Sequence, residues 1–146
     1  MQKLIILITA LAFWGCEKDS TGSGNGNSEL VGNWQGYIIE DGGIKEDVVF
    51  TISADIMDIH IYENPGDDEI YMTWSYSINN DASPKQIDIT ITEYPLSEFI
   101  GATILSIYKI EGNVLTIVFK EFDHDIRPTS FDNSDGNTNL FVLTKQ

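Results

Sequence analysis

Apolar and polar side chains alternate in short runs from residue 34 to residue 145, and this period of two constrains the fold more than any other feature. Alternation puts the apolar side chains of an extended strand on one face, so each run predicts a half-buried β-strand. No apolar pattern of helical period extends over ten residues here. We therefore predict an all-β domain with eight strands, near residues 34–40, 46–53, 56–63, 69–78, 86–92, 102–110, 114–121 and 139–145.

Turn sequences separate several of these strands, at Asp41–Gly43, Asn64–Asp67 and Gly112–Asn113. Proline fixes φ at the second position of a turn, and glycine accepts the positive φ that other residues avoid. Strands joined in this way are antiparallel neighbours. Eight of them can close into an up-and-down β-barrel, which leaves no free sheet edge. A two-sheet β-sandwich is the alternative, because the number of strands does not separate the two folds.

The alternation also predicts which side chains point inward. An eight-stranded barrel is either filled by its own side chains or left with room for one small ligand. A hydrophobic ligand would lie in an open apolar cavity of a few hundred Å³, whereas a filled barrel with an exposed apolar patch would indicate a protein-interaction or inhibitor module. The candidate pocket residues are Phe50, Met72, Trp74, Tyr76, Phe119 and Phe141. The other predicted interior residues are Ile52, Met57, Ile59, Ile61, Ile87, Ile89, Ile91, Leu115, Ile117 and Leu143.

The N-terminus has the pattern of a targeting segment. Residues 1–15 contain Lys3 and then an apolar run that is too short to span a bilayer, as in a signal peptide. Leu11, Ala12, Gly15 and Cys16 resemble the lipobox of bacterial lipoproteins, a resemblance which implies that the Cys16 thiol is lipidated and that Cys16 begins the mature chain. A plain secretory signal with an incidental cysteine is the alternative.

A polar segment follows the cysteine, and it contains no large apolar side chain. Residues 16–28 are therefore predicted to be the lipidated cysteine and a flexible tether, with the barrel domain at residues 29–146. The implied partner is a membrane, held through the lipid on Cys16, and the implied location is the bacterial cell envelope. Residues 17–19 resemble the export tags of some surface lipoproteins, which favours the outer membrane or the cell surface.

Two family resemblances support the fold. Gly32 and Trp34 are similar to the G-x-W opening of lipocalin-like domains, in which the tryptophan plugs one end of the barrel and a basic residue of the last strand packs across it. Lys145 has the matching place for that basic residue. A cation over an indole ring contributes about 0.5–2 kcal/mol. The resemblance implies a barrel whose end is closed by Trp34 and Lys145.

The second half resembles a family of small secreted bacterial domains first noted in planctomycetes. The matching blocks are residues 84–88, 107–116 and 127–131, and the chain departs from the family at Ser106 and Val118. That family has no established activity. We expect structural roles for four residues in these blocks: Pro84 stiffens the approach to a strand, Gly112 supplies a turn, and Arg127 pairs with Asp88 or a neighbouring acid to hold the last loop.

Charge and motifs narrow the function classes. The net charge is −15, which argues against binding nucleic acid. His60 and His124 are the only histidines, and neither they nor residues 132–137 match a metal signature. No catalytic motif is present, and we expect no enzyme, cofactor or metal. The sequence predicts a lipid-anchored binding module for a small hydrophobic ligand, with a protein-interaction module as the alternative.

Overall fold

The computed structural model describes residues 29–40, 43, 45–62, 69–120, 125–134 and 136–146. Cys16, the signal peptide, the tether and His124 therefore lie outside the described residues. Eight strands make up nearly all of the described fold, and η3 (Ser97–Phe99) is a single 3₁₀ turn between two of them. The strands are β1 (Gly32–Ile39), β2 (Lys45–Ile52), β3 (Ile56–Tyr62), β4 (Ile70–Asn79), β5 (Gln86–Glu93), β6 (Thr103–Glu111), β7 (Val114–Lys120) and β8 (Thr138–Lys145).

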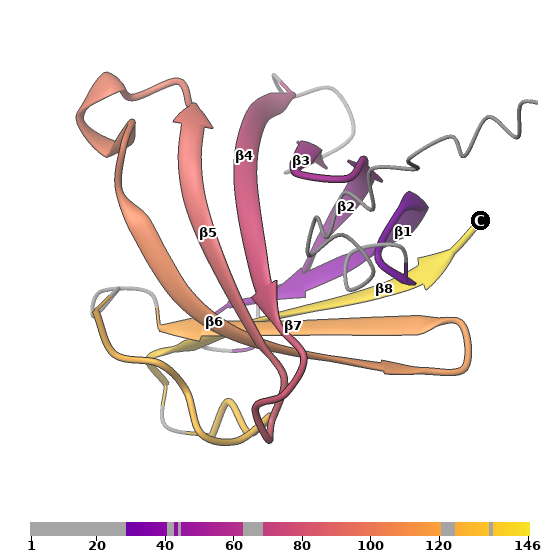
Figure 1. Ribbon diagram of the computed structural model, residues 1–146. Helices are drawn as coiled ribbons and strands as arrows, with labels where there is room; N and C mark the ends of the chain where they lie inside the picture. Colours follow the sequence, from indigo (N-terminus) through magenta and orange to yellow (C-terminus); the bar gives the residue numbers. More distant parts are fainter. Residues whose placement is uncertain (1–28, 41–42, 44, 63–68, 121–124, 135) are drawn as a thin grey trace, which may run out of the picture.

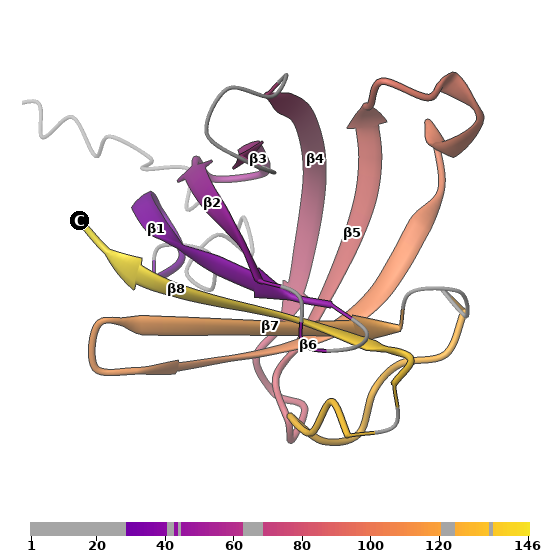
Figure 2. The ribbon, with the colours of Figure 1, turned by 180° about the vertical axis from the view of Figure 1, so that it is seen from behind.

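Each strand pairs with the next along the chain, and β8 pairs with β1, so the sheet is a closed antiparallel barrel (Figures 1 and 2). Trp34 lies opposite Lys145 in the pairing that closes it. The prediction of an eight-stranded up-and-down β-barrel is confirmed, and the β-sandwich alternative is wrong. None of the helical segments among the described residues is long and apolar enough to cross a membrane.

Close approach of two backbones makes this closure possible. Gly36 of β1 faces Leu143 of β8, and a Cβ atom on Gly36 would lie 1.9 Å from the carbonyl oxygen of Val142. That distance is far below any real contact, so only glycine fits at this position. The requirement comes from crowding against β8, not from an unusual backbone conformation.

The core follows the predicted alternation. All sixteen predicted interior side chains, from Phe50 to Leu143, belong to the buried core. The predicted interior set left out Ile38, Ile104 and Tyr108, which are buried in the same core. Ile38 and Tyr108 follow the alternation of β1 and β6, so the pattern contained them.

The barrel has two different ends. One end is called the base. The described chain enters the barrel there at Glu29 and Leu30, and residues 53–55, 80–85 and 112–113 connect strands at that end. Gly112, at φ +65°, opens the two-residue turn of the β6–β7 hairpin, at the right of Figure 1. We call the mouth the opposite end, where η3 and the start of β8 lie.

Residues 127–131 of the β7–β8 connection lie against the outside of the sheet. Arg127 Nη2 lies 2.5 Å from Asp88 Oδ1, and Arg127 Nη1 donates to the carbonyl oxygen of Ser106 at 2.5 Å. Lys109 Nζ lies 5.0 Å from the centroid of the Phe131 ring. Residues 127–131 therefore contact β5 and β6 directly, and the pairing of Arg127 with Asp88 is the one that the sequence predicts.

Candidate ligand-binding cavity

The mouth half of the barrel contains a cavity of about 480 Å³. Its size lies within the range of pockets that bind small molecules. Side chains from β1, β3, β4, β5, β6, β7 and β8 line it, together with Phe99 of η3. The lining residues are Ile38, Glu40, Ile61, Met72, Trp74, Ile91, Tyr94, Phe99, Ile104, Phe119, Asn139 and Phe141.

Aromatic rings form the inner boundary of the cavity. Trp74, Phe119 and Phe141 line it, and the Phe119 and Phe141 rings stack with centroids 5.6 Å apart. Phe50 is fully buried and packs edge-on against Phe141, at 5.0 Å between centroids, and against Trp74, at 6.1 Å. Such pairs are worth about 0.5–1.5 kcal/mol beyond the area they bury. This aromatic layer lies between the cavity and the base.

Four of the six predicted pocket residues line the cavity: Met72, Trp74, Phe119 and Phe141. Phe50 does not line it and belongs to the aromatic layer. Tyr76 does not line it either, because its hydroxyl donates to the carbonyl oxygen of Ser53 at the base, at 2.7 Å.

Sequence reasoning missed several lining residues, among them Glu40, Tyr94, Phe99 and Asn139. Tyr94 and Phe99 follow β5 in a connection without alternation, and their rings meet edge to face at 5.5 Å. Asn139 is a polar residue at an inward position of β8, and a search for alternating apolar residues does not identify it. The position of Glu40 at the end of a strand gave no signal.

Two buried polar atoms in the lining residues have no hydrogen-bond partner among the described residues. These are Nε1 of Trp74 and Oδ1 of Asn139, in side chains that are each 4% exposed. An unsatisfied buried donor or acceptor costs about 1–3 kcal/mol. Both atoms are shielded from solvent, so a ligand group would reach them only after a side-chain rotation.

The base is closed by a tryptophan whose polar atom is satisfied. The indole of Trp34 is 1% exposed, and its Nε1 donates to the carbonyl oxygen of Leu30 at 2.7 Å. Lys145 Nζ lies 5.1 Å from the ring centroid of Trp34. These contacts place Trp34 and Lys145 in the arrangement that the lipocalin-like resemblance implies.

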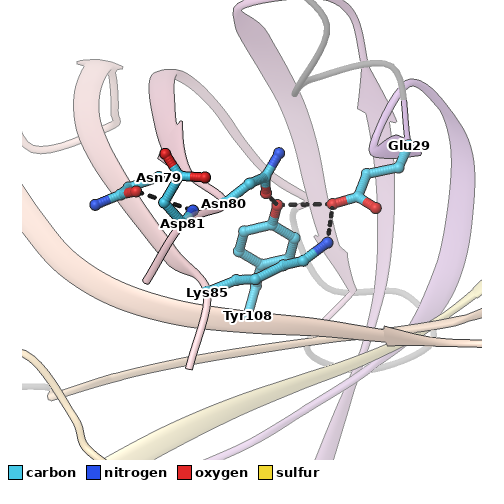
Figure 3. A network of polar contacts seen from close by, with 6 residues as sticks. All are labelled: Glu29, Asn79, Asn80, Asp81, Lys85 and Tyr108. Carbon is cyan, nitrogen blue, oxygen red and sulfur yellow. Dashed lines mark hydrogen bonds and ion pairs between the residues drawn. The ribbon is translucent and has the colours of Figure 1, made fainter. Parts of the chain in front are cut away.

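A polar network secures the start of the domain at the base (Figure 3). Glu29 Oε1 lies 2.8 Å from Lys85 Nζ and accepts a hydrogen bond from the Tyr108 hydroxyl, also at 2.8 Å. The same hydroxyl lies 2.5 Å from Asn80 Oδ1. The Tyr108 hydroxyl has a single hydrogen to donate, so it donates to only one of these two acceptors at a time. The network joins the chain segment before β1 to the β4–β5 hairpin and to β6.

Burial and hydrogen bonds shift the pKa values of this network. Burial alone would raise the pKa of Glu29, but the hydrogen bonds from Lys85 and Tyr108 outweigh it, so that pKa lies below its ordinary value. Burial, followed by the hydrogen bond to Glu29, raises the pKa of Tyr108. Burial, together with the charge of Asp55, raises the pKa of Tyr76 to about 12.

The remaining predicted site candidates lie on the outside. His60 Nδ1 contacts Glu69 Oε1, and this hydrogen bond lowers the pKa of Glu69. His60 lies between the inward-facing Ile59 and Ile61 on β3, so the pair faces away from the cavity. Within the part of the chain that the structure describes, no three His, Cys, Asp or Glu side chains are grouped so that they could hold a metal ion.

Pro84 and Gly112 lie in connections at the base, where the sequence predicts structural roles for them. The fold and the cavity together define a class of protein: a closed eight-stranded up-and-down barrel with a buried tryptophan at one end and a cavity at the other. Comparison of the chain with protein-family models, curated proteins and solved structures finds no match. The function must therefore be argued from the cavity and from the sequence.

Proposed function

We propose that this protein is a lipid-anchored, non-enzymatic binding module of the bacterial cell envelope, which holds a small hydrophobic molecule in the mouth of a lipocalin-like barrel. The observation that carries this proposal is the apolar cavity of about 480 Å³. Aliphatic and aromatic side chains make up most of its lining, and burial of apolar ligand surface against them contributes about 25 cal/mol per Å².

The position of the chain start supports an anchored arrangement. Glu29 and Leu30 lie at the base, on the opposite end from the cavity. Residues 16–28 would span at most about 45 Å when fully extended. A lipid on Cys16 would thus hold the protein by its closed end and leave the mouth free to exchange ligand.

The anchor is tested by changing Cys16 to Ala in cells and separating the membrane fraction. We expect the variant to leave that fraction, because lipidation requires the thiol. Retention of Cys16→Ala in the membrane fraction would contradict a lipid anchor. Ser77→Ala, which changes an exposed side chain of β4, is the matched control and should stay with the membrane.

Ligand binding is tested by filling the cavity. Ile104→Phe adds a ring within the lining, and we expect it to abolish the binding of retinoids or fatty alcohols, measured by fluorescence. Val49→Phe makes the same kind of change on the outward register of β2, opposite His60, and should leave binding intact. Equal binding by both variants would contradict a ligand site in the cavity.

A second candidate function rests on exposed apolar side chains. Leu96 is 54% exposed, and Ile100 is exposed beside it in the β5–β6 connection. Exposed apolar groups that are clustered mark protein contacts in many domains. If this surface binds a protein, Leu96→Ser with Ile100→Ser would remove the partner in pull-down experiments and leave the cavity ligand bound.

A further inference from the structure

We propose that the cavity takes uncharged apolar molecules and discriminates against anionic amphiphiles such as fatty acid carboxylates. This inference rests on the proposed function, because it names the chemical class of the cavity's ligand. It is carried by the charges in and around the lining residues.

The lining offers no positive charge to an anionic head group. Among the residues that the structure describes, it contains no lysine, arginine or histidine, and Glu40 is the one acidic side chain in it. Glu46, on the same register of β2 as the buried Val48, lies opposite the lining residue Ile38 and adds a second carboxylate near the mouth. A carboxylate ligand would therefore meet charges of its own sign.

The cations nearest to the mouth are directed elsewhere. Lys120 follows the inward-facing Phe119, so it points outward, and its Nζ donates to the Thr138 hydroxyl at 2.9 Å. Lys45 Nζ lies 4.6 Å from the Tyr37 ring centroid, on the outer register of β2. The other cations of the described residues have partners at the base or on the outer face; they are Lys85, Lys109, Arg127 and Lys145.

Desolvation turns this distribution of charge into selectivity. A carboxylate that leaves water for an apolar site without a cation is strongly disfavoured, and a nearby like charge increases the penalty. An alcohol of the same chain length loses only the hydrogen bonds of one hydroxyl group.

The experiment compares 1-decanol with decanoate, which share an apolar chain and differ in head-group charge. Trp74 reports on the cavity wall, so the full chain is used with Trp14→Phe and Trp34→Phe, which leave Trp74 as its one tryptophan. At neutral pH we expect a saturable change in Trp74 fluorescence with decanol, and binding of decanoate at least about tenfold weaker. Decanoate binding as tight as decanol would overturn the inference and leave the proposed function standing. Binding of neither probe would overturn both.

Variants of single charges show whether the cavity itself discriminates. Glu40→Gln removes the lining carboxylate, and we expect it to strengthen decanoate binding relative to decanol binding by about three- to tenfold. Asp47→Asn makes the same change in net charge on the exposed outer register of β2 and is the matched control. Equal gains in both variants would show that net charge, not the cavity, sets the preference, and would overturn the inference. No gain in Glu40→Gln would overturn the role of Glu40.

Discussion

The base and the mouth of this barrel are built from the same strands, yet their interiors differ. At the base, Trp34 fills the interior, and its indole nitrogen donates to Leu30. At the mouth, Trp74 borders a cavity, and its indole nitrogen has no partner among the described residues. The comparison teaches that alternation makes the wall of a barrel, whereas the volume of the inward side chains decides whether an end is filled. At the base, a polar contact from outside the strands satisfies the buried tryptophan.

The largest expected effect is a difference in how much substitutions at the base and at the mouth lower the free energy of unfolding. Trp34→Ala removes a fully buried indole from the plug, and we expect it to lower the free energy of unfolding by about 3–5 kcal/mol. Phe99→Ala trims a partly exposed ring at the mouth and should cost less than about 1.5 kcal/mol. Denaturant unfolding of both variants measures this difference, and similar losses would remove the distinction between the two ends.

The stability of the protein at alkaline pH tests the role of Tyr76, whose hydroxyl donates a hydrogen bond at the base. The pKa of Tyr76 is raised to about 12 from an ordinary 10, so its stabilising contribution is complete below pH 10 and is lost as the pH rises towards 12. We therefore expect the stability gap between the natural protein and Tyr76→Phe to narrow by about 1–2 kcal/mol over that range. A gap that stays constant from pH 9 to pH 12 would show that burial of the hydroxyl has no such effect.

The two tryptophans differ in hydrogen bonding, and replacing each with phenylalanine exposes the difference. Trp34→Phe loses the hydrogen bond to Leu30 and should cost about 1 kcal/mol or somewhat more. Trp74→Phe removes a donor that has no partner, so we expect a change within about 0.5 kcal/mol. Thermal unfolding measures the stability of both variants. A larger loss of stability for Trp74→Phe than for Trp34→Phe would contradict this expectation.

The smallest effect concerns the network at Glu29. Its pKa is lowered in the folded state, so the network's contribution is present above the ordinary pKa of 4.5 and is lost as the pH falls through the folded value. Because Glu29 and Lys85 are partly exposed, we expect Glu29→Gln to cost about 1 kcal/mol or less at pH 7 and nothing at pH 2. Urea unfolding at both pH values provides the check, and a cost that persists at pH 2 would contradict it.

The sequence predicted the wall of the barrel well because alternation is a local signal. Every strand was expected within two residues of its observed bounds, and the inward side of Phe50, Trp74 and Phe141 followed from the same pattern. Closure between β1 and β8 joins the two ends of the domain, so no local pattern specifies it. The crowding at Gly36 depends on that closure and could not be predicted without it.

The cavity was harder to predict than the wall. Whether inward side chains fill a barrel depends on their total volume across all eight strands, and periodicity does not measure volume. Phe99 and Tyr94 reach the cavity from a connection, and Asn139 interrupts the apolar pattern of β8. Tyr108 joins Glu29 and Asn80 across three separate parts of the chain, which no spacing of residues indicates.

The most direct test of the central claim, a closed base and a ligand-binding mouth, uses the two tryptophans as reporters. One variant keeps only Trp74 and the other keeps only Trp34, both in a chain that carries Trp14→Phe, and each is titrated with 1-decanol. We expect a saturable fluorescence change for Trp74, with one decanol bound per chain, and almost none for Trp34. Equal responses from both tryptophans, or no saturable response from Trp74, would contradict a binding cavity confined to the mouth.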